Sequence, residues 1–244
     1  MKTFAAVAIF AVTLLMGAVP IAFSSSKKLK SLLNYCNALT TGIFLSIGLI
    51  HLLPEAVERF TASSTNDPTV IFIYCAATAL VLQVIETIGK RISKEDNSKY
   101  LPYFLAVVLA IHSILEGCVL GFESNPSYAV AIFIAIIAHK GAESFSLITN
   151  MVTHNISRNI SIAVLIIFSF MTPIGIFTGA FLINSSWIKA NNVLQPYFNA
   201  AAAGTFIYMA INNKSYKNKN NITIHIALAL IGFTFMAILS HYIS

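Results

Sequence analysis

Two histidine–glutamate pairs stand at the same spacing in neighbouring apolar stretches of the sequence. His112 and Glu116 are four residues apart, and so are His139 and Glu143. Residues at positions i and i+4 lie on one face of an α-helix, so each pair can direct an imidazole and a carboxylate to the same side. Two imidazoles and two carboxylates suit a borderline divalent cation such as Zn²⁺, Fe²⁺ or Mn²⁺. We therefore predict that the four side chains form one metal site.

The surroundings of the two pairs are those of a membrane protein. Only 10% of the 244 residues are charged and 57% are hydrophobic, whereas a soluble domain carries about 25% charged residues. An ionisable side chain near the middle of a spanning helix costs on the order of 2.5–3.5 kcal/mol. Four such groups at matched depth argue against a membrane scaffold without a site. The remaining alternative is scattered polar contacts between helices, with each histidine bonded to a backbone carbonyl.

Eight apolar segments are long enough to cross a bilayer, which takes about 20 residues each. They predict an all-α membrane protein with a single domain over 1–244, joined by short polar loops such as 90–100. Pro54 and Pro173 fall inside segments, where protein or water must satisfy the freed carbonyl groups. The predicted spans are 4–23, 34–57, 69–89, 101–122, 127–149, 160–184, 193–212 and 222–243.

Basic residues are distributed unevenly between the two sides of these spans. The side that holds both termini has only Lys2, Arg59 and Lys189. Since loops rich in Lys and Arg stay in the cytosol, both termini are predicted to be extracytosolic. The net charge of +6 then reflects cytosolic loops and does not indicate nucleic-acid binding. Eleven basic residues lie in loops on the other side: Lys27, Lys28, Lys30, Lys90, Arg91, Lys94, Lys99, Arg158, Lys214, Lys217 and Lys219.

The first apolar segment has two interpretations. Residues 1–22 contain a lysine, an apolar stretch and small residues, as a cleaved signal peptide does. A retained first span is favoured, because the apolar run is long for a signal peptide and the lysines after it suit a cytosolic loop. Cleavage would leave seven spans and the same orientation for the rest.

Other polar residues lie near the four predicted ligands or along the same route. Lys140 stands beside His139 deep in its span, where it could pair with Glu116 or Glu143, or take the place of a second cation. His51 and Glu55 are again four residues apart, in the outer third of the membrane. They predict an entrance or gate, the alternative being interfacial side chains that reach water.

Glycines recur at a spacing that favours helix packing. Gly117 and Gly121 form Gly-x-x-x-Gly in the fourth span, and Gly175 and Gly179 form it in the sixth. This spacing lets another helix approach closely. Packing is the expected role of both motifs, and close packing around the fourth and fifth spans would fit a buried transport pathway.

Taken together, these motifs resemble those of the ZIP family of divalent-metal transporters. The resemblance covers essentially the whole chain: His-x-x-Pro-Glu in the second span, His-Ser-x-x-Glu-Gly-x-x-x-Gly in the fourth, His-Lys-x-x-Glu in the fifth and Gly-Thr-Phe-x-Tyr within 200–208. It implies an eight-helix bundle whose first three and last three helices form an inverted pair around the fourth and fifth. It also implies that His112, Glu116, His139 and Glu143 bind the transported ion.

The same resemblance implies a difference at the site. In some members two metal ions bind, with an Asn beside the first His and a carboxylate or similar ligand at the second auxiliary position. Here these positions are Ser113 and Lys140. Because a cation repels a cation, we expect the second metal position to be lost. A His-rich loop between the third and fourth spans, found in many relatives, is also missing from the sequence.

We therefore expect a transporter that moves Zn²⁺ toward the cytosol, with Fe²⁺, Mn²⁺ and Cd²⁺ as the other candidate ions. Its partners would be divalent ions and the lipid bilayer, with no further cofactor. Whether it forms a homodimer, and whether it lies in the plasma membrane or an organelle membrane, stay open. The alternative is an intramembrane zinc-dependent hydrolase that uses the same ligands to activate water. Against it, no separate general base stands out and no His-Glu-x-x-His occurs.

Overall fold

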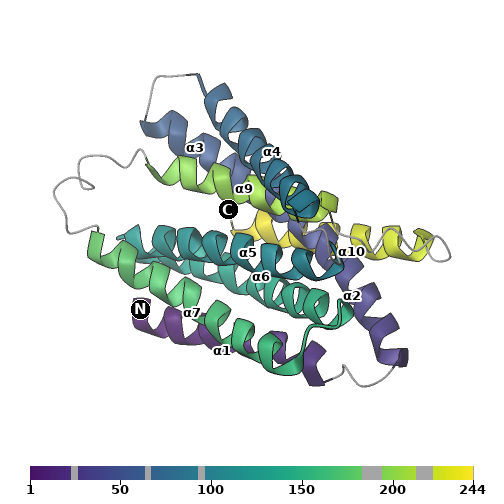
Figure 1. The fold of residues 1–244 in the computed structure, drawn as a ribbon. Helices are drawn as coiled ribbons and strands as arrows, with labels where there is room; N and C mark the ends of the chain where they lie inside the picture. The colour runs from purple at the N-terminus through teal and green to yellow at the C-terminus, as the bar shows by residue number, and fades with distance from the viewer. Residues whose placement is uncertain (23–26, 64–66, 93–96, 183–193, 213–221, 244) are drawn as a thin grey trace.

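The computed structural model describes residues 1–22, 27–63, 67–92, 97–182, 194–212 and 222–243, and their regular elements are all helices (Figure 1). Elements α2, η1 and α3 continue into one another, so the described chain forms eight helical rods, which confirms the predicted fold class. The elements are α1 (Lys2–Ala22), α2 (Lys27–Ser46), η1 (Ile47–Leu52), α3 (Leu53–Ser63), α4 (Thr69–Ile92), α5 (Asn97–Phe122), α6 (Pro126–Thr153), α7 (Arg158–Leu182), α9 (Leu194–Asn212) and α10 (Ile222–Ile243).

Within the residues described, seven rods are long and apolar enough to cross a membrane, and α9 is the exception. α9 packs on α4, α3 and η1, and several of its polar side chains face protein instead of lipid. Those polar residues lower its mean hydropathy. Its 19 residues still extend about 28 Å, close to the ~30 Å thickness of the hydrocarbon core.

Several helices continue beyond their predicted bounds. α4 extends to Ile92 and α5 begins at Asn97, so most of the predicted loop 90–100 is helical, while 93–96 lie outside the described residues. Helical hydrogen bonds do not require apolar side chains, and a helix can therefore continue into its polar flanks.

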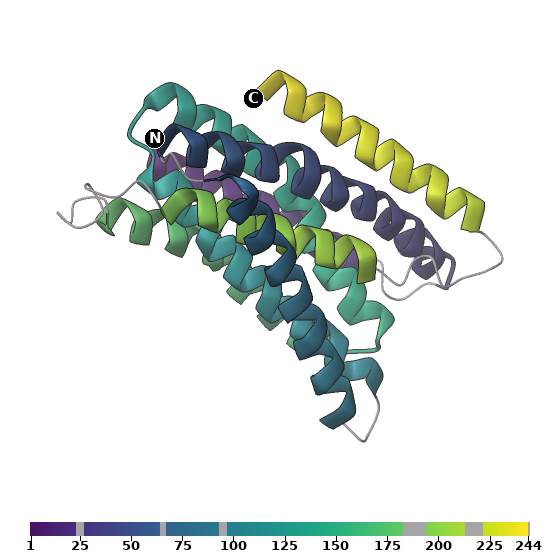
Figure 2. The same cartoon turned by 90° about the horizontal axis from the view of Figure 1, so that it is seen from above.

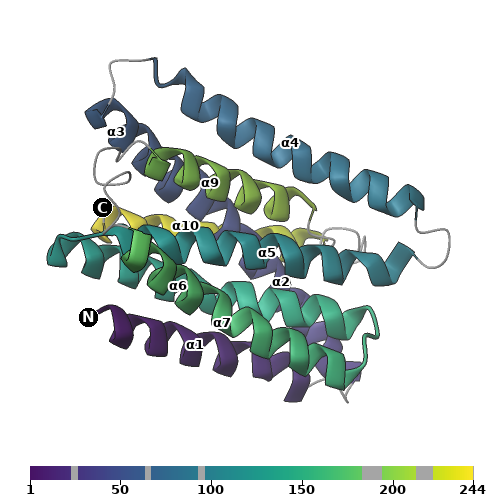
Figure 3. The ribbon, with the colours of Figure 1, turned by 60° about the vertical axis from the view of Figure 1, so that its left-hand side comes forward.

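The rods alternate in direction, and both chain termini lie at one end of the bundle (Figure 3). The turn between α5 and α6 lies at the same end. We call this the terminal end, and the other the opposite end.

The helices pack as two groups. The first group is α1, α5, α6 and α7, in which α5 packs on α7 and α1 packs on both α6 and α7. The second group is α2–η1–α3, α4, α9 and α10, in which α10 runs beside α2 at one edge (Figure 2) and α4 packs on α9. Contacts between the groups are fewer and are made mainly by α2 with α6 and by α5 with α9.

The closest helix pairs match one another in the way an inverted repeat requires. An inverted repeat matches α1 with α7, α2–α3 with α9, α4 with α10, and α5 with α6. Under this matching the α5–α7 pair corresponds to the α6–α1 pair. The α2–α10 pair likewise corresponds to the α9–α4 pair, and both members of each match pack closely. This pairing agrees with two inverted three-helix units around α5 and α6.

Glycines make the closest contacts inside each group. A Cβ added to Gly117 would lie 2.3 Å from the Thr172 carbonyl oxygen, and one added to Gly175 would lie 2.2 Å from that of Ile114. The two predicted Gly-x-x-x-Gly motifs therefore face each other across the α5–α7 contact. In the second group, a Cβ on Gly42 would lie 1.8 Å from the Ala229 carbonyl oxygen. Such close backbone contacts leave each group little freedom to deform.

Candidate metal centre

The antiparallel helices α5 and α6 bring the four predicted ligands together. A short turn joins them, and Asn125 caps α6 by accepting a hydrogen bond from the Ser127 amide at 2.9 Å. One ligand atom from each of the four side chains lies within 4.8 Å of the others. All four residues are buried: His112, Glu116, His139 and Glu143. The two i, i+4 faces predicted from the sequence thus meet at one level of the bundle.

The Oε1 atoms of both carboxylates face the imidazoles. Glu116 Oε1 is bonded to His139 Nε2 and lies 4.0 Å from His112 Nε2. Glu143 Oε1 lies 3.4 Å from His112 Nε2 and 3.5 Å from His139 Nε2. Two imidazole nitrogens and two carboxylate oxygens therefore converge on one point.

A threonine of α9 fixes the orientation of the first imidazole. Thr205 Oγ1 donates to the Ala202 carbonyl at 2.6 Å and lies 3.2 Å from His112 Nδ1. Because a hydroxyl has one hydrogen, Thr205 accepts from Nδ1–H. The lone pair of His112 Nε2 is then directed at the cluster, as in histidines that bind metal through one nitrogen and donate through the other.

Lys140 contacts Oε2, the other oxygen of each carboxylate. Its Nζ lies 2.8 Å from Glu143 Oε2, 3.3 Å from Glu116 Oε2 and 2.7 Å from Ser113 Oγ. These three contacts match the three hydrogens of an ammonium group. The Ser113 hydroxyl in turn donates to the Leu109 carbonyl at 2.7 Å. Ser113 and Lys140 are thus in direct contact, and the lysine bridges both glutamates.

Two buried atoms at the centre of the cluster have no hydrogen-bond partner. They are His112 Nε2 and Glu143 Oε1, 3.4 Å apart. A buried polar atom left without a partner costs free energy, and a cation between these atoms would remove that cost for both. The donor set of two imidazoles and two carboxylates is one that Zn²⁺ accepts.

A cavity of about 530 Å³ connects the cluster with the terminal end. His112, Glu116 and His139 line its inner part, while Glu143 and Lys140 lie beyond it. Polar residues from other helices also line the cavity; they are His51, Glu55, Glu58, Arg59, Asn199, Ser240 and His241.

The predicted entrance residues lie on the wall of this cavity. His51 belongs to η1, a π-helical segment that directly precedes Pro54, and its Nδ1 is buried without a partner. Wider π turns often occur where a side chain is directed to a functional site. Glu55 is paired with Arg59 at 2.8 Å, and Arg59 lies 4.0 Å from Glu123 in the α5–α6 turn.

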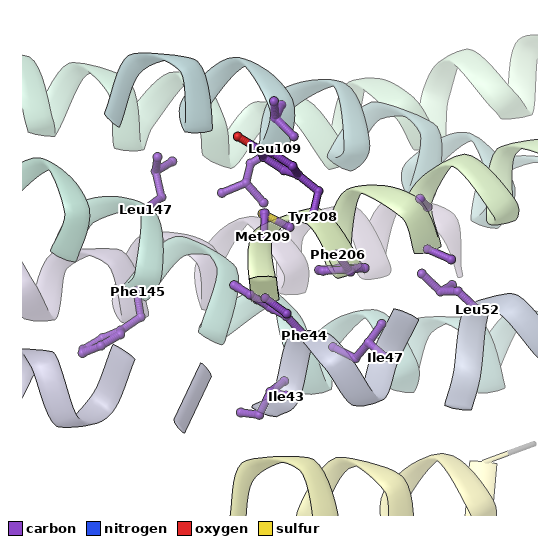
Figure 4. Close-up of a cluster of buried hydrophobic side chains, with 14 of the residues drawn as sticks. Ile43, Phe44, Ile47, Leu52, Leu109, Phe145, Leu147, Phe206, Tyr208 and Met209 are labelled. Carbon is purple, nitrogen blue, oxygen red and sulfur yellow. The ribbon is translucent and has the colours of Figure 1, made fainter. Parts of the chain in front are cut away.

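Toward the opposite end the path is closed by apolar side chains. The Phe206 ring contacts both imidazoles, with centroid distances of 4.3 Å to His112 and 5.4 Å to His139. Behind it lies Phe44, at 5.5 Å between ring centroids. Figure 4 shows part of the buried apolar cluster to which these rings belong, and its labelled side chains come from α2, η1, α5, α6 and α9. The metal centre thus lies between an open half and a packed half.

Thr205 and Phe206 contact the histidines; both belong to the Gly-Thr-Phe-x-Tyr motif noted in the sequence, but no role at the site was predicted for them. Asn199 and Ser240, which line the cavity with buried polar atoms that have no partner, were missed. Neither has a companion at ligand spacing, and the signal for each was one polar residue in an otherwise apolar span.

Sequence comparisons with known proteins identify relatives of this chain. A model of the family described as "ZIP Zinc transporter" matches residues 1–102 and 89–240. "Protein zntD" of Dictyostelium discoideum is 30% identical over 62% of this chain and 23% of its own length. "Zinc transporter ZIP1" of Takifugu rubripes is 30% identical over 60% and 49%, and "Zinc transporter 3" of Arabidopsis thaliana is 27% identical over 84% and 73%. The chain spans about half or less of the length of the first two relatives.

Proposed function

The chain belongs to the ZIP zinc transporter family, and we propose that it carries Zn²⁺ or a related divalent cation across a membrane, toward the cytosol. The ion would bind His112, Glu116, His139 and Glu143. The family is one of multi-pass membrane transporters and not of enzymes, so the hydrolase alternative is not pursued.

One observation carries the proposal. Two glutamates and two histidines converge in the membrane interior, and an Nε2 and an Oε1 at their centre have no hydrogen-bond partner. Lys140 supplies one positive charge against the two carboxylates, and an unbalanced charge in the membrane interior is expensive. A divalent cation that sheds its water and binds the four side chains would supply the missing positive charge.

The cavity provides the route to the site. It reaches three of the four ligands from the terminal end. With both termini extracytosolic, as the positions of the basic residues indicate, this arrangement is open to the outside. The ion would enter past His51 and Glu55, which is their proposed entrance role.

Release requires the opposite end to open. All four ligands belong to the first group, while Thr205 and Phe206 of the second group close the site on its other side. Movement of one group relative to the other would expose the ligands to the cytosol, as alternating access requires.

Lys140 limits the site to a single ion. Its ammonium group contacts the Oε2 atoms of both glutamates, where a second cation would have to bind. Measuring the metal content of the purified protein, after removal of loosely bound ions, tests this. One tightly bound zinc per chain is expected, and two at the transport site would refute it.

Uptake of radiolabelled zinc by cells expressing the protein tests the function. We expect His139→Ala and Glu143→Ala to abolish uptake, while Ser161→Ala, which removes a hydroxyl that donates to the Ser157 carbonyl just before α7, leaves it unchanged. Protons compete with the cation for the same ligands, so uptake should fall as the external pH is lowered. No uptake by the wild type at normal surface expression would remove the transporter proposal.

A further inference from the structure

A line of polar residues continues along α6 from the site toward the opposite end. Glu143 is followed on the same helix face by Ser146 and Asn150, at i+3 and i+7. With a rise of 1.5 Å per residue, they lie about 4.5 and 10.5 Å farther along the helix axis. Ser146 is 3% exposed, although it lies among the apolar residues that close this half.

Ser146 makes an unusual hydrogen bond for a buried helical serine. Elsewhere in the first group, Ser113 and Ser169 donate to the carbonyl four residues earlier in their own helix, as such residues commonly do. Ser146 instead donates to Asn37 Oδ1 of α2 at 2.9 Å. It thereby joins a helix of the first group to one of the second.

Asn37 is well supported in this position. It is 8% exposed, and its side-chain Oδ1 also accepts a hydrogen bond from the Thr40 hydroxyl of α2 at 3.3 Å. On the other helix, the Asn150 amide donates to the Ser146 backbone carbonyl at 2.9 Å, which leaves the Ser146 hydroxyl available for Asn37. The acceptor of the cross-helix bond is therefore held by its own helix.

A second, small cavity lies beside this bond. It has a volume of about 30 Å³, enough for a water molecule, and its polar lining residues are Ser146, Asn150, Tyr208 and Asn212. Phe44 and Phe104 are among the apolar residues that line the rest of it. This cavity places polar side chains next to empty space inside the packed half, where a path could open.

Polar contacts between the two groups occur at three levels of the bundle. Arg59 and Glu123 are 4.0 Å apart at the terminal end, Thr205 and His112 are 3.2 Å apart at the site, and Ser146 and Asn37 are 2.9 Å apart beyond it. We propose that the Ser146–Asn37 hydrogen bond is a latch that holds the opposite end closed, and that the polar face of α6 beyond Glu143 is the exit path of the cation. The proposal rests on the proposed transport function, because an exit path needs a transported ion.

The latch explains how the closed half can still open. An apolar contact alone would leave the departing cation no oxygen ligands. When the groups move apart at this end, the Ser146 hydroxyl and Asn37 Oδ1 no longer bond each other and can contact the hydrated ion. Neutral oxygen donors bind Zn²⁺ more weakly than the His/Glu cluster does, so the ion is passed on and not retained.

Thiol labelling from the cytosolic side tests the latch. The reporter is Leu105→Cys, at a residue lining the small cavity, in a chain whose Cys36, Cys75 and Cys118 are replaced by alanine. Inside-out vesicles are treated with a membrane-impermeant thiol reagent in zinc-free buffer. We expect Ser146→Ala to raise the labelling rate roughly three- to tenfold, since one buried hydrogen bond no longer favours the closed state.

A matched control and a double-mutant cycle separate the latch from general loosening. Ser144→Ala removes a buried hydroxyl of α6 that donates within its own helix, to the Gly141 carbonyl at 3.2 Å, and should leave the rate unchanged. Asn37→Ala should raise the rate as Ser146→Ala does, and the double variant should not exceed the larger single effect. Equal labelling of Ser144→Ala and Ser146→Ala, or single effects that multiply in the double variant, would overturn the latch.

The labelling result is independent of zinc transport. Variants are compared only when their melting temperatures lie near that of the parent. Ser146→Thr, which keeps a hydroxyl at this position, serves as the rescue variant. Restored slow labelling in Ser146→Thr supports the bond. If the wild type takes up no zinc while labelling behaves as expected, the transport proposal fails and the latch remains a closure between the two groups.

Discussion

The two halves of the bundle on either side of the His/Glu cluster differ in how they use their polar residues. Toward the terminal end, polar side chains line an open cavity of about 530 Å³, and several of their buried atoms have no partner. Toward the opposite end there is a separate cavity of only about 30 Å³, and Ser146 and Asn37 are bonded to each other. The unpartnered groups that line the large cavity are available to an arriving ion, while the Ser146–Asn37 bond joins the two groups of helices in the packed half.

Helices that correspond to each other in the inverted repeat therefore differ between the two halves: some line the open cavity and others close the packed half. The ligands on α5 and α6 lie at the boundary, reached from one side and sealed by Phe206 on the other. If the terminal end closed and the opposite end opened, the same four side chains would be accessible from the other side. Four substitutions test which residues maintain the boundary between the open cavity and the packed half.

Lys140→Met should have the largest effect, because it removes the charge that both glutamates share. Two buried carboxylates would then face each other without Lys140, and losing one partner of a buried pair costs about 3–5 kcal/mol. We expect the free energy of unfolding in detergent to fall by this amount in EDTA, and zinc to restore more stability than in the wild type. Lys2→Met is the control, since Lys2 only donates to the Gly121 carbonyl near a helix end. Equal losses in both variants would contradict the shared role of Lys140.

Phe206→Ala should break the seal between the two halves. The ring is fully buried against both histidines and Phe44, and truncating a buried phenylalanine costs roughly 3 kcal/mol. We expect lower stability and zinc leakage from preloaded proteoliposomes. Phe177→Ala, at a side chain on the outside of α7 that is 51% exposed, should show neither. Tight vesicles with Phe206→Ala would mean that the seal lies elsewhere.

His51→Ala should affect only the open half. His51 lines the cavity but is not among the four ligands, so its loss should weaken capture of the ion and not the later steps. The expected change is a roughly threefold higher KM for zinc uptake at an unchanged maximal rate. His225→Ala, a buried histidine packed edge-on against Tyr35, is the control. A lower maximal rate at unchanged KM would argue against an entrance role.

Arg59→Gln should have the smallest effect. The Arg59–Glu55 pair is about a quarter exposed, and such pairs contribute at most about 1 kcal/mol. Without the positive charge at the cavity mouth, zinc uptake at limiting concentration should rise by less than about twofold, and added salt should abolish the gain. Arg59→Lys, which keeps the charge, should match the wild type. A gain that persists at high salt would point to a steric effect.

The sequence predicted the features that depend on spacing within one helix. The i, i+4 pairs on α5 and α6 and the glycine motifs on α5 and α7 required only helical periodicity and apolar flanks, and the structure brings the members of each set together. Lys140 was predictable as a neighbour of the glutamates for the same reason. The role of these residues in binding metal stays a proposal, tested by the uptake experiment.

Features that depend on register between distant helices could not be predicted. The contact of Thr205 with His112 joins residues 93 positions apart, and that of Ser146 with Asn37 joins residues 109 apart. Thr205 stood in the Gly-Thr-Phe-x-Tyr motif, but the motif did not say which residue it would contact, and no local pattern distinguished Ser146. The π segment before Pro54 was indicated only as a break in the helix, without the direction in which it turns His51.

The position of Lys140 between the two glutamates has an electrical consequence. With both carboxylates ionised, both imidazoles neutral and Lys140 charged, the vacant site carries one net negative charge, and a divalent cation changes this to one net positive charge. If the protein has the proposed orientation, a membrane potential that is negative on the cytosolic side would draw the loaded site inward and push the vacant site back. A charge crossing 100 mV gains about 2.3 kcal/mol, so voltage would favour both halves of the cycle.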